Sequence, residues 1–151
     1  MLFPEKGSEW TTPSLTATPN HLEGVAQTNH NRTINRRKWN LEELQEVLKS
    51  NTPQKKVFES LKQLISLRKK QAAFHPNAKQ EILNLGNHLF GLIRTSKNKK
   101  QIIILIVNLT HEEQSFSLPE KLKNFDFDLI RNRKIDHHIL KPYQFLWITN
   151  R

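Results

Sequence analysis

Two neighbouring stretches between residues 40 and 72 place their apolar residues at the spacing of an α-helix. The first helix begins after Asn40, whose side chain can accept a hydrogen bond from a free N–H group of the first turn. Two glutamates follow in that turn, where acidic groups suit the positive end of the helix dipole. Thr52 and Pro53 then start a second helix, because threonine caps well and proline fits the first helical position. The pattern therefore predicts a helix pair.

The second helix gathers its large apolar side chains on one stripe. Its members recur at helical spacing: Val57, Phe58, Leu61, Leu64 and Ile65. Both helices need an apolar surface to pack against, and residues 40–72 supply too little of it. Much of that surface must therefore come from outside residues 40–72.

From about residue 80 the apolar period changes from that of a helix to that of a strand. Seven short strands are predicted, the sixth only weakly: 81–85, 88–94, 101–108, 114–118, 125–130, 134–138 and 143–149. The apolar run 102–107 is typical of a central strand that is buried on both sides. In the fifth strand apolar residues alternate with Asp126 and Asp128, which predicts one buried face and one solvated face. Strands at this spacing indicate a small antiparallel β-sandwich.

Residues 1–39 lack a sustained apolar period. They contain three of the seven prolines and many Ser, Thr and Asn residues, which are typical of a loop. The chain thus divides into an irregular loop segment at 1–39, a helix pair at 40–75 and a C-terminal antiparallel β-sandwich at 76–151. This is a mainly β fold with two helices.

The composition narrows the function classes without selecting one. The formal net charge is +10, but the basic residues lie in short scattered groups, so we expect a solvated basic surface and not a nucleic-acid partner. The absence of cysteine excludes disulfides and thiolate metal sites and allows a reducing compartment. The first ten residues lack the apolar core of a secretory signal, and the run 102–107 is too short to span a bilayer. We expect a cytoplasmic protein without a membrane partner.

Few residues form the patterns that metal binding or catalysis needs. The seven histidines include no HxxxH or HExxH pair, and His137 and His138 would point to opposite faces of a strand. The four glycines are isolated, so no phosphate-binding loop is present, and no GxSxG elbow occurs. Two N-x-T sequons, at Asn31 and Asn108, fit chance occurrence. We expect no metal and no cofactor.

Two motifs nevertheless resemble those of a known enzyme family. Residues 20–36 read NHLEGVAQTNHNRTINR, similar to a family pattern of N-D, E-G-V and T followed by R-[S/T/D]-I-N-R. Residues 71–78 read QAAFHPNA, which resembles the family's junction between a helix and a β domain. From about residue 20 to its end, the chain is similar to sucrose phosphorylase and related glucosyl phosphorylases of the α-amylase superfamily, glycoside hydrolase family 13. His21 departs from the pattern, since the family usually has Asp there.

This resemblance implies a place for each segment. The loop segment would end the active-site loop after the last strand of a (β/α)8 barrel, the helix pair would belong to the last barrel unit, and the β-sandwich would follow. The stripe of the second helix would normally meet barrel helices that this chain lacks, so we expect it to be partly uncovered and to offer a face for self-association. Arg32, Asn35 and Arg36 would lie near the acceptor and phosphate side of the pocket. Guanidinium and amide groups suit phosphate oxygens and sugar hydroxyls. The alternative is that these three side chains brace the loop by binding backbone carbonyls.

The resemblance also implies the activity of a parent enzyme, the retaining phosphorolysis of an α-glucoside such as sucrose to α-glucose 1-phosphate and fructose in carbohydrate metabolism. Sugar and phosphate would be its partners. In the family the catalytic carboxylates lie on earlier barrel strands, and none is matched in this chain. We therefore expect a C-terminal fragment that has no catalytic residue and is inactive alone. Two other interpretations stay open: a non-catalytic β-sandwich that binds a protein or a glycan, and a basic nucleic-acid-binding protein. Tyr143 and Trp147 share a strand face but are expected in the core.

Overall fold

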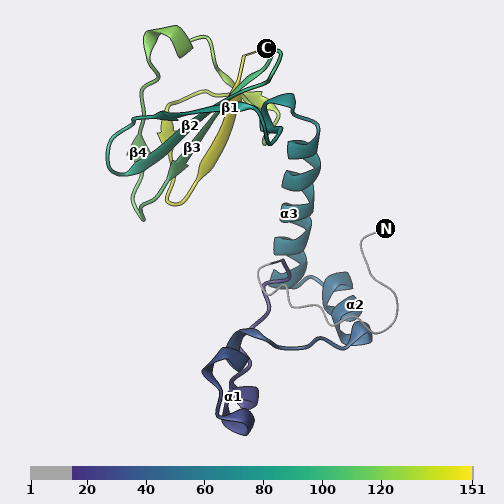
Figure 1. The fold of residues 1–151 in the computed structure, drawn as a ribbon. Coiled ribbons are helices and arrows are strands. Elements are labelled where there is room, and N and C mark those ends of the chain that lie inside the picture. The colour runs from purple at the N-terminus through teal and green to yellow at the C-terminus, as the bar shows by residue number, and fades with distance from the viewer. Residues whose placement is uncertain (1–14, 151) are drawn as a thin grey trace. The chain divides into compact units, whose positions relative to one another are not determined.

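The structure is a computed structural model that describes residues 15–150 (Figure 1). These residues gather into two units, a helical unit that ends at Ile65 and a β unit that begins at Ser66. The boundary lies within the helix α3 (Pro53–Lys69). Each unit is described by itself below.

The helical unit begins with more regular structure than the sequence predicted. The helix α1 (Leu22–Thr28) and the 3-10 turn η1 (Asn31–Asn35) lie in the segment where only loop was expected. That expectation was wrong because α1 is too short to show an apolar period, and its only buried residue is Gly24. The part of the predicted loop at 1–14 lies outside the described residues.

The predicted helix pair is confirmed as α2 (Leu41–Lys49) and α3. The Asn40 side chain accepts a hydrogen bond from the Glu42 N–H (2.8 Å), and the Thr52 hydroxyl accepts one from the Lys55 N–H (3.2 Å). Both helices are described over their full length, and neither contains a buried residue. The apolar stripe of α3 is thus incompletely covered, with Ile65 49% exposed. No helix in the described residues is long and apolar enough to cross a membrane.

The β unit consists of short antiparallel strands in two sheets, which confirms the predicted β-sandwich. The larger sheet has the order β1-β2-β3-β8-β5-β6, and β4 pairs with β7. The interior position of β3 agrees with the prediction for 102–107. The elements are η2 (Ala72–Phe74), β1 (Lys79–Leu83), β2 (Leu89–Thr95), β3 (Ile102–Asn108), β4 (Gln114–Ser115), η3 (Glu120–Leu122), β5 (Phe127–Asp128), β6 (Arg133–Lys134), β7 (Ile139–Leu140) and β8 (Phe145–Thr149).

Two details of the strand prediction were wrong. The weak strand at 134–138 is absent, since β6 ends at Lys134 and β7 begins at Ile139. Asp128, predicted on a solvated face, is only 2% exposed. Because β5 has just two residues, the alternation of the strand stops there, and the Asp128 carboxylate turns back to accept from the Ile130 N–H (3.0 Å) and to pair with Arg131 (2.8 Å). These two partners compensate for burying the charge.

The hydrophobic core lies between one face of the larger sheet and the segment that contains η3 and β7. Its buried members are Leu83, Leu89, Ile104, Ile106, Leu146 and Ile148 from the sheet, and Phe116, Leu118, Leu122, Phe125 and Leu140 from the covering segment. Burial of apolar surface at about 25 cal/mol per Å² makes this cluster the main source of stability of the β unit.

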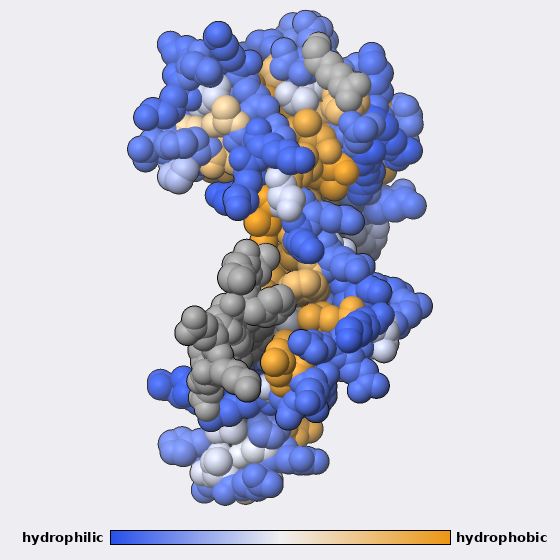
Figure 2. All heavy atoms as spheres, turned by 90° about the vertical axis from the view of Figure 1, so that its right-hand side faces the viewer, coloured by the Kyte–Doolittle hydropathy of each residue, from blue (hydrophilic) through white to orange (hydrophobic). Residues whose placement is uncertain are grey.

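The other face of the larger sheet, called the outer face below, is apolar but only partly covered. Leu92 pairs with Ile82 on one side and Leu105 on the other, and Leu105 pairs with Trp147, so one apolar row crosses four strands. Ile82 is 73% exposed, whereas Trp147 packs on Phe74 with ring centres 4.8 Å apart. Figure 2 shows apolar residues at the surface of the β unit, in the upper part of the view.

Tyr143 does not lie in the core, contrary to the expectation. It occupies the turn before β8, with a positive φ of 55°, and is 66% exposed. The turn ends the strand pattern before residue 143, so Tyr143 and Trp147 share no strand face.

Candidate functional site

The first family-like motif, residues 20–36, folds into a tight hairpin of α1 and η1. The His21 N–H donates to the Ile34 carbonyl (2.8 Å) and joins the two ends of the hairpin. Between them, the Thr28 hydroxyl lies 3.0 Å from the Thr33 hydroxyl. We call this hairpin the α1–η1 loop.

Gly24 is the point of closest approach inside the α1–η1 loop. A Cβ atom at this position would lie 2.4 Å from Nδ1 of His21 and 2.9 Å from Cγ2 of Thr33, both too close for real contacts. The imidazole of His21 therefore packs directly on the glycine. Its Nδ1 atom is buried and finds no hydrogen-bond partner among the described residues. The histidine that departs from the family pattern is the N-cap residue of α1, but its side chain fills space and makes no capping hydrogen bond.

The three site residues predicted from the sequence lie together at the exposed end of the α1–η1 loop. Arg32 and Asn35 belong to η1, and Arg36 is its C-cap. Since side chains at i and i+3 of a 3-10 helix lie above one another, Arg32 and Asn35 project from the same side. All three are exposed, and none of their side chains makes a hydrogen bond or ion pair with another described residue. The loop is closed by the contacts of His21 and Thr28, not by these three.

The next basic residue, Arg37, behaves differently from its neighbour Arg36. Its guanidinium pairs with the Glu43 carboxylate and lies 4.5 Å from the ring centre of Trp39. The Trp39 Nε1–H in turn donates to the Thr18 hydroxyl (2.9 Å). Arg37 is thus a bracing residue at the end of the polar run, and sequence reasoning did not single it out. The only signal was Glu43 in the first turn of the following helix.

The second family-like motif, QAAFHPNA, serves the packing of the β unit. Arg94 of β2 holds the motif with two guanidinium nitrogens: Nε donates to the Ala73 carbonyl (3.1 Å) and Nη2 to the His75 carbonyl (2.7 Å). The third, Nη1, donates to Oε1 of Gln80 in the neighbouring strand β1 (2.7 Å). From the strand side, the Gln101 side chain accepts from the Ala73 N–H (2.9 Å). We call this arrangement the Arg94 clamp. It accounts for Ala73 and His75 of the motif without a ligand.

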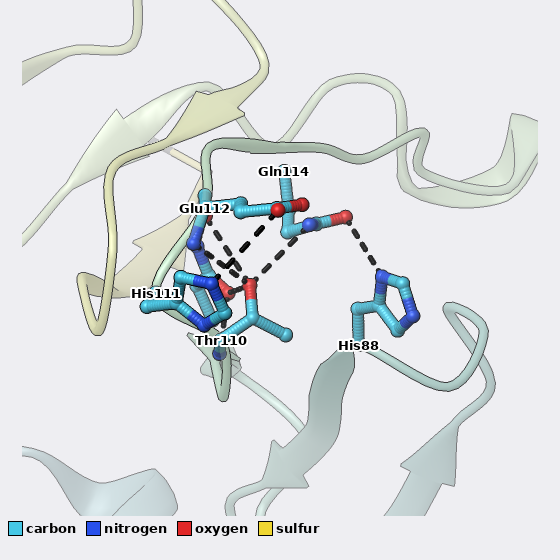
Figure 3. A network of polar contacts seen from close by, with 6 residues as sticks. His88, Thr110, His111, Glu112 and Gln114 are labelled. Atoms are coloured by element: carbon cyan, nitrogen blue, oxygen red, sulfur yellow. Dashed lines mark hydrogen bonds and ion pairs between the residues drawn. The ribbon is translucent and has the colours of Figure 1, made fainter.

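A polar network around β4 brings together histidine, glutamate, threonine and glutamine side chains (Figure 3). His88 contacts Gln114 (3.3 Å), and Gln114 donates to the Thr110 hydroxyl (3.3 Å). At its base Asn108, only 1% exposed, donates from Nδ2 to the carbonyls of Glu112 (2.7 Å) and Lys141 (2.9 Å). The network fixes two turns onto β3. Asn108 is therefore buried and fully engaged in hydrogen bonds.

Among residues 15–150, no group of three or more His, Asp or Glu side chains is arranged to hold a metal ion. The adjacent His137 and His138 lie between β6 and β7, and the ring of His138 packs edge-on against Phe116 with centres 5.0 Å apart. The groups of the α1–η1 loop that are available to bind a ligand are thus the unpaired guanidinium groups of Arg32 and Arg36 and the amide of Asn35.

Comparison with known proteins supports the resemblance seen in the two motifs. No family model matches the chain. A glucosylglycerate phosphorylase of Spirochaeta thermophila is 34% identical over 110 residues, which cover 72% of this chain and 19% of that protein. A glucosylglycerate phosphorylase of Escherichia coli is 29% identical over 149 residues, covering 89% of this chain and 24% of that protein. The chain thus spans a fifth to a quarter of the length of these curated relatives.

Solved structures of similar fold include two amylases. A maltogenic amylase from S. marinus matches 81% of this chain and 15% of its own, with a TM-score of 0.58 and 18% identity. An α-amylase from Anoxybacillus matches 78% of this chain and 25% of its own, with a TM-score of 0.56 and 17% identity. At this identity the likeness concerns the fold alone.

Proposed function

Because the chain belongs to the glucosyl phosphorylases of the α-amylase superfamily, glycoside hydrolase family 13, and corresponds to their C-terminal part, we propose that it serves as the C-terminal part of an α-glucoside phosphorylase. The parent reaction transfers a glucosyl group from an α-glucoside to phosphate with retention, giving α-glucose 1-phosphate and the released acceptor. Retention requires two carboxyl groups that flank the scissile bond, one as nucleophile and one as acid and base. No residue of this chain is matched to either, so the chain alone is proposed to be inactive.

The role proposed for this chain is to complete the acceptor and phosphate side of the pocket. The observation that supports it is the unpaired state of Arg32 and Arg36, which project from the α1–η1 loop with no anionic partner among the described residues. Arginine stays protonated and presents a planar fork of donors that matches phosphate or carboxylate oxygens. Asn35, beside Arg32, adds a donor and an acceptor for a hydroxyl.

This chemistry favours an anionic acceptor over a neutral one. One of the two free guanidinium groups can bind phosphate and the other a carboxylate of the acceptor. Fructose has no charged group for the second guanidinium to bind. Glycerate does carry a carboxylate, and both curated relatives are named glucosylglycerate phosphorylases. We therefore place glucosylglycerate ahead of sucrose as the glucosyl donor. In this proposal the two sugars and phosphate are substrates of the parent enzyme and not of the isolated chain.

The first experiment uses the purified chain with phosphate and either glucosylglycerate or sucrose, and measures the release of α-glucose 1-phosphate. We expect no release above background from either sugar. Glu23, the acidic residue of the α1–η1 loop, is the residue to substitute in parallel. Turnover that disappears in Glu23→Gln would overturn the proposal that the chain lacks its own catalytic carboxylate.

The second experiment joins this chain to the remainder of the E. coli relative, in place of the matching region. The hybrid is expected to release α-glucose 1-phosphate from glucosylglycerate. Substitution of Arg32 or Arg36 by Ala should raise the KM for phosphate or glucosylglycerate about tenfold or more, because a hydrogen bond to a charged group contributes about 1.5–3 kcal/mol. The matched control is Arg133→Ala, an exposed arginine of β6 without a side-chain partner among the described residues.

Two results would count against the role of the loop. An active hybrid with unchanged KM values in both arginine variants would remove Arg32 and Arg36 from the pocket. A hybrid with higher kcat/KM for sucrose than for glucosylglycerate would reverse the order of the two donors.

A further inference from the structure

We propose that the β unit carries a binding site for a sugar-sized phosphate monoester, in a pocket beneath the turn that joins β2 to β3. This site lies outside the α1–η1 loop and does not depend on the proposed function. Its pocket has a volume of about 530 Å³, within the range of small-molecule sites. The residues that the argument uses are Asn77, Lys79, Thr95, Lys97, Lys99 and Ile102.

The floor of the pocket is one row of side chains across three strands. Lys79 of β1 pairs with Thr95 of β2, and Thr95 pairs with Ile102 of β3. Residues that pair directly point to the same face of a sheet, so these three side chains stand side by side. Ile102 also packs against the hydrophobic core, which fixes its apolar surface at one end of the row.

The rim of the pocket is a turn whose backbone is held by its own hydrogen bonds. The Ser96 N–H donates to the Gln101 carbonyl (2.9 Å), and the Gln101 N–H donates back to the Ser96 hydroxyl (3.0 Å). The Lys99 N–H donates to the Ser96 carbonyl (2.8 Å), and Lys99 has a positive φ of 58°. The turn therefore presents Lys97 and Lys99 from a fixed backbone, which lowers the entropy lost when they bind a ligand.

The charge of the pocket matches that of one phosphate monoester. Lys79 is paired with Glu81 (3.1 Å), which also lines the pocket. Lys97 and Lys99 have no ion pair with a described residue, so three lysines and one glutamate leave a net charge of +2. A phosphate monoester carries a charge of about −1.5 to −2 near neutral pH. The two charges are therefore nearly equal and opposite.

The remaining groups suit the body of a sugar better than a bare phosphate ion. The side chains of Thr95 and Asn77 make no hydrogen bond with another described residue and can bind hydroxyl groups. Ile102 offers an apolar surface for the carbon face of a sugar ring. Inorganic phosphate would satisfy the lysines but leave these groups unused, so we expect it to bind more weakly than its sugar ester.

The test titrates the full chain with α-glucose 1-phosphate, inorganic phosphate and glucose, and follows amide shifts by NMR and affinity by calorimetry. We expect shifts at residues 77–79 and 95–102 with glucose 1-phosphate, weaker binding of phosphate at the same residues, and none with glucose. Equal affinity for phosphate and the ester would overturn the sugar-sized site. Shifts confined to the α1–η1 loop would overturn the pocket while supporting the proposed function.

Matched variants separate the pocket from diffuse surface charge. Lys99→Asn should weaken glucose 1-phosphate binding about tenfold, the effect of losing one hydrogen bond to a charged group. Asparagine tolerates a positive φ, so the turn should keep its shape. Lys100→Gln removes the same charge from the same turn, but Lys100 does not line the pocket, and we expect less than a twofold change. Equal losses in both variants, or retention on heparin without binding of the ester, would refute the site.

Discussion

The Arg94 clamp makes the sharpest prediction about stability. Removing the side chain in Arg94→Ala deletes three charge-assisted hydrogen bonds and leaves the carbonyls of Ala73 and His75 without these donors. Ala73 is completely buried, so its carbonyl has little access to water as a substitute partner. The other two acceptors are more exposed, and their bonds contribute less. At a net of about 0.5–1.5 kcal/mol for each bond, the total loss should be about 2 kcal/mol.

This loss is large enough to measure by thermal unfolding. For a domain of about 60–100 residues, 1 kcal/mol shifts the Tm by about 4–8 °C, so we expect a decrease of about 8–16 °C in the transition of the β unit. Fluorescence of Trp147 is a suitable probe because its ring packs on Phe74, which lies between the two carbonyls that Arg94 holds. Far-UV circular dichroism should show the same transition.

Two further variants test the reasoning behind this number. Arg94→Lys keeps the charge but loses the planar fork, so it should lose about half as much stability as the alanine variant. Arg133→Ala removes an arginine from β6 that has no side-chain partner among the described residues, and should change the stability by less than about 0.5 kcal/mol. If Arg94→Ala destabilised the protein no more than Arg133→Ala, the hydrogen bonds of the clamp would contribute nothing measurable to stability. The explanation of the QAAFHPNA motif would then fail.

The remaining predictions concern burial. Asn108→Ala should lower the free energy of unfolding by at least about 2 kcal/mol because it removes a buried side chain that donates to the Glu112 and Lys141 carbonyls and accepts from the Thr110 N–H. The exposed Asn87→Ala should be neutral in the same denaturation assay. Gly24→Ala should destabilise the α1–η1 loop through its clash with His21, and the cost measured by amide exchange should shrink in the double variant with His21→Ala, since alanine removes the ring. The isolated chain should bind a hydrophobic dye and self-associate through the α3 stripe and the outer face, since several incompletely buried side chains cost a few kcal/mol at about 25 cal/mol per Å². A protein that is monomeric by ultracentrifugation and does not increase the fluorescence of the dye would contradict this last prediction.

The parts of the fold that the sequence predicted are those fixed by neighbours along the chain. The caps at Asn40 and Thr52 form because the acceptor and the N–H group are two or three residues apart, so no tertiary information is needed. The same holds for the stripe of α3 and for the period of β2 and β3. Asp128 could not be placed in this way, because its burial depends on where β5 stops and the chain turns toward Arg131.

The QAAFHPNA motif shows the same limit at longer range. Its first residues cap α3 and form η2, which local patterns can indicate, but its function in the fold depends on Arg94, 21 residues beyond Ala73. Nothing in the motif itself indicates an arginine on β2. The resemblance to a family could mark the motif as distinctive, but only the hydrogen bonds explain why these residues are needed at a junction between a helix and a sheet.

The site residues make this distinction sharpest, because Arg36 and Arg37 are adjacent and chemically identical. From the sequence alone either could have been a ligand-binding or a bracing residue. The structure separates them by direction: Arg37 reaches Glu43 and Trp39, while Arg36, at the end of η1, faces no described partner. A guanidinium group that is already paired gains little from binding an anion, since it must first give up a partner of similar strength. An unpaired one loses only water. The proposed binding role therefore rests on Arg32 and Arg36. In the hybrid enzyme, Glu43→Gln removes the ion pair of Arg37 and should leave the KM for phosphate unchanged, because the Arg37 guanidinium would still lie over the Trp39 ring.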